Sequence, residues 1–449
     1  MAFLWSLGSF IIALGILVAV HEWGHFWVAR RCGVHVERFS VGFGKPLWRR
    51  VDKLGTEYVI AAIPLGGYVR MLDERVDNVP ANKAHKAFNR QSVSKRMAII
   101  AAGPGVNFIF AVLALFVMYL IGVQTIKPIV GEITPGSIVA QAGLESGDEI
   151  IAVGSRKTLD WEAVNLELIS YVGDKKLPIT LKRARGFEQE LIIPIDKWKF
   201  DPDKQSSLAS LGIAPMRPDI TLEIAVVAKN SAAQRIGIQV GDRITHFEQQ
   251  SIANWQELVA KISERPSATV EFTVVRAQQN VQLIGELDQT DGEFGPRGYL
   301  GVSPRVEPWP DGVVFKHQYG MIDGFYQALD RTWRLMTLSV EMIGKLFTGD
   351  VSVKNLSGPI SIAQGAGASA EYGFVYFLSF LALISVNLGI INLLPLPMLD
   401  GGHLMYFSIE WLTGKPVSEN IQEIGFKIGG VLLLGLMSIA IFNDIARLG

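Results

Sequence analysis

The residues best suited to chemistry in this sequence are His21, Glu22 and His25, in the segment His-Glu-Trp-Gly-His. In a helix, residues i and i+4 lie on the same face, so both imidazoles could bind one Zn²⁺ with the glutamate beside them as a general base. Residues 1–20 carry no charged side chain. Ionisable groups at membrane depth are costly and usually functional. The pattern therefore predicts a metalloprotease whose chemistry takes place in or at a membrane.

Two other interpretations of this segment are weaker. It could be a polar helix end where the chain leaves the lipid, but two histidines and a glutamate would still need buried partners. It could belong to a secreted zinc protease, whose extended motif continues with a glycine and a third histidine. This chain has Val28 and Arg31 at those positions, so a third metal ligand must come from elsewhere in the sequence.

The composition indicates membrane spans combined with soluble domains, because 49% of residues are hydrophobic and 19% are charged. A formal net charge of −1 argues against nucleic acid as a partner. Cys32 is the only cysteine, which excludes an intrachain disulfide and a cysteine-rich metal site. The N-terminus lacks the basic start of a signal peptide, so we expect the first apolar stretch to be retained.

Apolar stretches of about 20 residues predict four transmembrane helices. They lie within 1–30, 97–123, 372–399 and 424–443. Four crossings put both termini on the same side of the membrane.

The segments between the predicted helices can be assigned to sides. The loop 31–96 is rich in Lys and Arg, which favours the cytoplasmic side, and the loop 400–423 would lie there too. Short β-like runs at 34–41 and 58–63, punctuated by glycines, occur in the first loop. Both termini and the long segment between the second and third helices are then expected on the opposite, outer side of the membrane.

That long segment contains a repeat. Six residues recur at a constant offset: Ser137, Gly143, Gly147, Asp148, Ile150 and Trp161 match Ser231, Gly237, Gly241, Asp242, Ile244 and Trp255. A glycine turn, an aspartate and then an aliphatic strand resemble the signature of bacterial PDZ domains. We predict two such α+β domains, at 124–218 and 219–308. PDZ folds can bind chain ends by strand addition, but the repeat does not show that these copies do, and two β-rich domains that bind no ligand are the alternative.

An amphipathic helix is predicted within 309–371. Its apolar positions follow steps of three and four residues: Phe325, Leu329, Trp333, Met336, Val340, Ile343 and Phe347. This face could pack into a protein core or lie in the membrane interface.

The candidate third metal ligand follows the third predicted helix, in the segment Asn-Leu-Leu-Pro-Leu-Pro-Met-Leu-Asp that ends at Asp400. Prolines break a helix, and irregular backbone at membrane depth occurs where it lines a cavity or packs in protein. The ends of the first and third helices meet on the cytoplasmic side, which would bring Asp400 near His21 and His25. His403 is a rival ligand. Two histidines and one carboxylate leave a position open for water, as in catalytic zinc sites.

Taken together, these motifs resemble the site-2 protease family of intramembrane zinc metalloproteases over essentially the whole chain. Further matching motifs are Gly-Pro-Gly-Val-Asn at 103–107 and Asn-Leu-Ser-Gly-Pro-Ile at 355–360. The resemblance implies zinc ligands at His21, His25 and Asp400, with Glu22 as the catalytic glutamate.

The resemblance also implies substrate contacts. They would come from Asn392, from the loop containing Pro395 and Pro397, and from a membrane re-entrant β-hairpin around residues 34–72 that includes Gly66 and Gly67. The implied substrates are single-pass membrane proteins of the anti-sigma factor type, already shortened on their periplasmic side, and signal-peptide remnants. The implied location is the bacterial inner membrane.

Two other functions are compatible with parts of the sequence. A membrane adaptor could use the repeated domains to bind tails and keep a structural metal, but a structural zinc needs no base beside its ligands. A transporter could also contain broken helices and buried charges, but no similarity relates the first pair of spans to the second. Assays for zinc and for cleavage of a membrane substrate separate the three.

Overall fold

The computed structural model describes residues 2–76, 78–200, 205–292 and 295–447. The chain forms two compact units, each with its own hydrophobic core. The larger unit comprises Met1–Ala214 and Phe315–Gly449, and the smaller one comprises Pro215–Val314.

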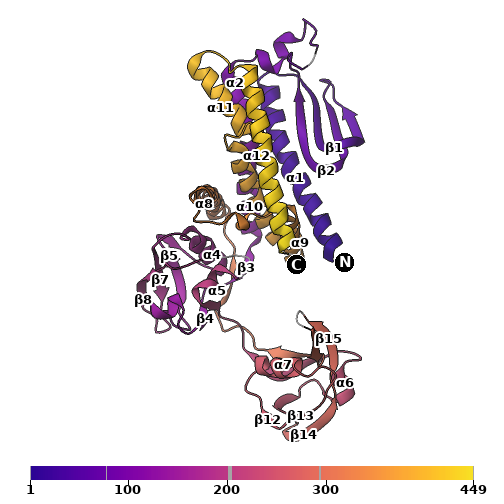
Figure 1. The fold of residues 1–449 in the computed structure, drawn as a ribbon, viewed down its shortest axis with the longest axis vertical. Coiled ribbons are helices and arrows are strands. Elements are labelled where there is room, and N and C mark those ends of the chain that lie inside the picture. Colours follow the sequence, from indigo (N-terminus) through magenta and orange to yellow (C-terminus); the bar gives the residue numbers. More distant parts are fainter. Residues whose placement is uncertain (1, 77, 201–204, 293–294, 448–449) are drawn as a thin grey trace. The chain divides into compact units, whose positions relative to one another are not determined.

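Within the described residues, four helices of the larger unit are long and apolar enough to cross a membrane. They are α1 (Ala2–Arg31), α2 (Val93–Ile121), α10 (Phe374–Leu393) and α12 (Glu419–Ala446). Helix α2 packs against both α1 and α10, and the start of α1 and the end of α12 lie at the same end of this unit (Figure 1). This is the arrangement that an even number of crossings requires.

The third of these helices ends before the two prolines that the sequence predicts to break it. α10 stops at Leu393 rather than near residue 399, and helix α11 (Asp400–Thr413) occupies much of the predicted loop 400–423. Pro395 and Pro397 account for the break, because proline lacks an N–H and disfavours helical backbone in the residue before it. Asp400 is therefore the first residue of a new helix.

Helix α12 is held at its C-terminal end by a buried carboxylate. Asp444 accepts hydrogen bonds from the backbone amides of Gly358 (2.9 Å) and Ile360 (2.8 Å) and from the hydroxyl of Ser361 (2.5 Å). These groups belong to the start of helix α9 (Pro359–Tyr372). A negative charge at a helix N-terminus satisfies free amides and complements the helix dipole, so this contact anchors α12 to α9.

Between α1 and α2 the chain forms a β-hairpin of two long, bent strands, β1 (Val36–Val51) and β2 (Glu57–Met71). Residues 38–41 pair with 57–60 and also with 67–70, so this part of β1 is the centre of the sheet. Gly42 adopts φ +91°, and a Cβ there would lie 2.8 Å from the Ile63 carbonyl oxygen. The bend in β1 therefore requires glycine. Short 3-10 helices at Ala84–Lys86 and Phe88–Arg90 lead into α2.

The turn between β1 and β2 is tied to the end of α1. Arg30 forms an ion pair with Asp52, and the hydroxyl of Thr56 donates to the carbonyl oxygen of Val36 at 2.6 Å. Burial raises the pKa of Asp52, but hydrogen bonds from Arg30 and from backbone amides of the turn outweigh it and lower that pKa to about 2. The hairpin is thus fixed to α1 at one end and projects along it.

The repeated segments fold alike. The first copy contains β3 (Val123–Ile126), β4 (Val130–Ile133), α3 (Ile138–Gln141), β5 (Glu149–Val153), β6 (Arg156–Lys157), α4 (Trp161–Ser170), β7 (Lys176–Lys182), β8 (Glu188–Pro194), α5 (Ser207–Leu211) and β9 (Ile213–Pro215). The second contains β10 (Ile220–Val227), α6 (Ala232–Ile236), β11 (Arg243–Phe247), β12 (Gln250–Ser251), α7 (Trp255–Ser263), β13 (Thr269–Arg276), β14 (Gln279–Glu286), β15 (Asp288–Gly292), β16 (Gly295–Tyr299) and β17 (Val302–Val306). The strand order β6-β5-β7-β8 in one copy matches β12-β11-β13-β14 in the other. Strand β18 (Val314–His317) pairs with β3.

The repeated aspartates have the same structural role in both copies. Asp148 and Asp242 are each 1% exposed, and each accepts a hydrogen bond from the backbone amide three residues earlier. Asp148 also pairs with Arg183 at 2.6 Å, and Asp242 pairs with Arg276 at 2.8 Å. The glycine before each aspartate has a positive φ, 87° in one copy and 90° in the other. The repeat therefore encodes one turn, used twice.

Helix α8 (Met321–Thr348) exposes part of its apolar stripe. Trp333 is 59% exposed, Val340 60% and Phe347 85%. The buried face consists of other residues, among them Ala328 and Leu335, which pack against α2 and α10. Two residues of the stripe, Met336 and Ile343, pack against the core shared with α2 and α10, so one part of the stripe is packed and another part is exposed. A short 3-10 helix (Val353–Asn355) leads from α8 towards α9.

Candidate metal centre

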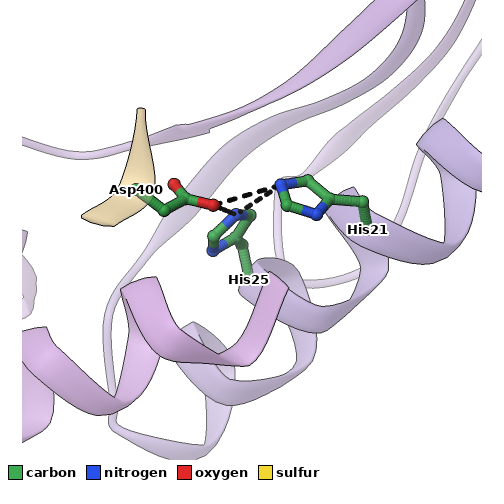
Figure 2. A group of neighbouring side chains, drawn as sticks. All are labelled: His21, His25 and Asp400. Carbon is green, nitrogen blue, oxygen red and sulfur yellow. Dashed lines mark hydrogen bonds and ion pairs between the residues drawn. The ribbon is translucent and has the colours of Figure 1, made fainter. Parts of the chain in front are cut away.

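His21 and His25 lie one turn apart on α1 and point into the bundle. Their exposed fractions are 9% and 7%, and their Nε2 atoms are 3.2 Å apart (Figure 2). Two imidazole nitrogens at this separation are well placed to share a cation. The helical spacing alone produces this pair, as the sequence predicts.

Asp400 completes the cluster from the other side of the bundle. Its Oδ2 lies 3.2 Å from Nε2 of His21 and 3.4 Å from Nε2 of His25 (Figure 2). The tight turn before it depends on the glycine that follows, since a Cβ on Gly401 would lie 2.2 Å from the carbonyl oxygen of Leu394. The broken helix therefore brings a carboxylate from the C-terminal part of the chain onto the N-terminal helix.

The three atoms fit a zinc ion. In a tetrahedral site with Zn–N and Zn–O bonds of about 2.0–2.1 Å, neighbouring ligand atoms are about 3.3 Å apart, close to the 3.2, 3.2 and 3.4 Å observed. Oδ2 of Asp400 is buried and makes no hydrogen bond within the described part of the chain. A divalent cation would also offset the charges of Asp400 and Glu22 in this buried setting.

His403, the rival ligand, lies outside this cluster. Among the described residues, the group of ligand atoms within 4.8 Å of one another comprises His21, His25 and Asp400. The His403 ring instead packs against Phe426, with ring centroids 5.6 Å apart. It lies three residues after Asp400 on α11, but its ring nitrogens are not part of the group of ligand atoms.

The outer nitrogens of both histidines are held by α2. Nδ1 of His25 lies 2.9 Å from the carbonyl oxygen of Ile99. Nδ1 of His21 lies 3.1 Å from the side-chain amide of Asn107. Metal-binding histidines characteristically have such partners, which fix the ring orientation.

Two glycines allow α1 and α2 to approach this closely. A Cβ on Gly24 would lie 2.4 Å from the carbonyl oxygen of Ala102. A Cβ on Gly103 would lie 2.3 Å from Nε2 of His25 and 2.9 Å from Cε1 of His21. Gly103 therefore forms a wall of the metal centre, a role that sequence reasoning missed although the Gly-Pro-Gly-Val-Asn motif stood out in an apolar span.

Glu22 faces the hairpin. A Cβ on Gly67 would lie 3.1 Å from Cγ of Glu22 and 2.7 Å from Cγ1 of Val18. The Glu22 carboxylate also interacts with the backbone amide of Val69. Strand β2 thus passes directly beside the candidate base, and Gly67 is the residue that allows the contact.

The other predicted substrate contacts have these neighbours in the structure. Asn392 lies half-buried in the last turn of α10, and its side chain makes no hydrogen bond within the described residues. Pro395 and Pro397 form the turn before Asp400, where Pro397 lies against Gly429 of α12. Gly66 has φ +117° and lies against Phe43 of the hairpin.

Comparison with known proteins identifies the family. The model of peptidase family M50 matches residues 9–436. The chain belongs to peptidase family M50. This M50 peptidase is 52% identical to Protease RseP of Yersinia pestis over 100% of both chains. It is 51% identical to the regulator of sigma-E protease RseP of Escherichia coli K12, again over 100% of both.

Among solved structures, the M50 peptidase is similar to the PDZ domain of an SdrC-like protein from Listeria innocua. The identity is 20% and the TM-score 0.17, over 20% of this chain and 97% of that one.

The M50 assignment confirms the resemblance to site-2 proteases. The protein is a zinc metalloprotease, and its four apolar helices make it a membrane protein. The adaptor and transporter alternatives are excluded by this assignment, since neither is a peptidase.

Proposed function

We propose that this protein is an intramembrane endopeptidase in which His21, His25 and Asp400 hold zinc and Glu22 is the general base. The observation that carries the proposal is the convergence of three ligand atoms from α1 and α11 at separations of 3.2 to 3.4 Å. The candidate base belongs to the same helical turn as two of these ligands. A general base beside the ligands is needed for hydrolysis, whereas a purely structural zinc site does not need one.

The metal and the protein have different roles in the proposed hydrolysis. Zinc, when bound, acts as a Lewis acid that polarises the scissile carbonyl and makes water more acidic. Glu22 takes a proton from the attacking water and returns it to the leaving amine. Its place against β2 keeps it between the metal centre and the strand, where an extended substrate would pass.

We infer that the hairpin re-enters the membrane and binds substrate by strand addition. In the part of the chain that the structure describes, residues 67–69 pair with β1 along one edge, and their other edge would accept a further strand. Leu47 at 73% and Trp48 at 50% exposure would suit contact with lipid. Gly66 and Gly67 would let the substrate backbone come close to strand β2. Asn392 and the turn containing Pro395 and Pro397 would contact the substrate on its other side.

We infer the orientation from the loops. The segment 31–96 with its Lys and Arg would face the cytoplasm, together with the metal centre. Both termini and the repeated domains, taken as two PDZ domains, would lie in the periplasm of an inner-membrane protein. The exposed apolar residues of α8, Trp333, Val340 and Phe347, support an interfacial position for that helix.

The proposed substrates are single-pass membrane proteins trimmed on their periplasmic side, of the anti-sigma factor type, and signal-peptide remnants. The names of relatives as regulators of sigma-E support the first class. An unwound helix supplies the extended backbone that strand addition needs.

The ligand assignment predicts a clear difference between two neighbouring residues. Asp400→Ala should lower zinc occupancy and abolish proteolysis, because it removes one of three protein ligands. His403→Ala should keep zinc, because its ring packs on Phe426 instead. Metal analysis of detergent-purified protein and cleavage of a reconstituted membrane substrate measure both. The opposite pattern would transfer the third ligand to His403.

The periplasmic domains are proposed to exclude substrates by size. Replacing residues 215–314 with a short Gly/Ser linker removes one compact unit and leaves the other. This variant should cut a substrate that keeps its bulky periplasmic domain, which the full chain should reject. Cleavage of trimmed and untrimmed substrates is measured side by side. If the folded, zinc-loaded variant instead fails to cut trimmed substrate, the domain recruits substrates.

A further inference from the structure

One face of α2 serves both candidate histidine ligands. Ile99, Gly103 and Asn107 are spaced four residues apart and therefore share this face. The first contacts His25, the second leaves room for the metal, and the third contacts His21. Ile99 faces its histidine with a carbonyl oxygen, whereas Asn107 faces its histidine with an amide nitrogen.

The difference concerns which atom faces the histidine. An imidazole that binds a metal through Nε2 carries its proton on Nδ1, and so needs an acceptor there. The carbonyl oxygen of Ile99 provides one for His25 at 2.9 Å. At His21 the nearest atom is Nδ2 of Asn107, a donor, at 3.1 Å. Two donors cannot form a hydrogen bond with each other.

The other end of the same amide resolves this conflict. Asn107 is 0% exposed, and its Oδ1 has no hydrogen-bond partner within the described residues. The oxygen and nitrogen of a carboxamide exchange places by a half-turn of the group, and their assignment follows from the hydrogen-bond network. With the oxygen turned towards His21, the Nδ1 proton gains the acceptor it needs.

We propose that Asn107 is a positioning residue for the metal ligand His21. Its carboxamide oxygen accepts the Nδ1 proton, which fixes the tautomer that leaves Nε2 free for zinc and holds the ring in place. This inference rests on the proposed ligand set of His21, His25 and Asp400.

Asn107 also takes part in a helix-packing contact that does not involve its carboxamide. The hydroxyl of Ser385 on α10 donates to the main-chain carbonyl oxygen of Asn107 at 2.8 Å. This bond joins α10 to α2 at the same place without using the carboxamide. Ser385→Ala therefore perturbs helix packing there and leaves the contact with His21 intact, which makes it the matched control.

The test measures zinc affinity by chelator competition on full-length protein in detergent. Asn107→Leu, similar in size but without an acceptor, should weaken zinc binding by about 10- to 100-fold. Asn107→Asp should restore tight binding, because a carboxylate accepts the same proton. Ser385→Ala should bind zinc as the wild type does. The visible spectrum of the Co²⁺-substituted protein should change for the Leu variant and return for the Asp variant.

Three results would overturn the proposal: unchanged zinc affinity in Asn107→Leu, no rescue by Asp, or an equal loss in Ser385→Ala. If the Leu variant does not fold, Asn107→Ser, which is too short to reach His21, has the same expected loss. Asp400→Ala tests the proposed ligand set separately from the role of Asn107. If that variant loses zinc while Asn107→Leu keeps it, only the role of Asn107 fails.

Discussion

Replacing Glu22 by Gln is expected to lower proteolysis by at least about 100-fold while zinc content stays unchanged. Glutamine has nearly the shape of glutamate, so its place against Gly67 and β2 is kept. Its amide cannot take a proton from water, so the attacking nucleophile is no longer generated. Zinc analysis and cleavage of a reconstituted single-pass substrate are measured on the same preparation.

The control for this variant is Glu419→Gln, the same change in an exposed residue at the start of α12. It should cleave substrate as the wild type does. Retained turnover in Glu22→Gln would refute the assignment of Glu22 as base. Loss of zinc in that variant would show that the carboxylate is needed to build the site.

Replacing Gly103 by Ala is expected to lower zinc affinity by roughly 100-fold, with a matching loss of proteolysis. The new methyl group would lie 2.3 Å from Nε2 of His25 and 2.9 Å from Cε1 of His21. Either α2 must move away or both imidazoles must turn from their common point. Chelator competition measures the affinity.

Gly105→Ala is the matched control, because it adds the same methyl group to the same helix two residues away. No atom lies within 4 Å of a Cβ at Gly105, so this variant should keep zinc and activity. If both variants lose zinc, the effect comes from the helix rather than from the wall of the metal centre. If Gly103→Ala keeps zinc, the approach of α2 to the histidines is looser than described.

Local spacing in the sequence was enough to predict part of this site. His21 and His25 share a helical face because they are four residues apart. Glu22 lies between them in the sequence, which is enough to predict it as the general base. The four spans followed from uncharged length, because a helix that crosses lipid needs about 20 apolar residues. The repeated Gly-Asp turn could be recognised because positive φ favours glycine and the aspartate satisfies local amides.

Contacts between distant segments were decided only by the tertiary structure. The sequence favours Asp400 over His403 as the third ligand but leaves both open, and in the structure the turn at Pro395 and Pro397 places Asp400 at the start of α11, against α1. An apolar stripe such as that of α8 has the same periodicity whether it is exposed or buried, so only its neighbours decide which of its residues pack in the core. Gly103 and Asn107 acquire their roles because α2 packs against the two histidines. Periodicity specifies which residues share a face, whereas the partner of that face depends on packing between segments far apart in the chain.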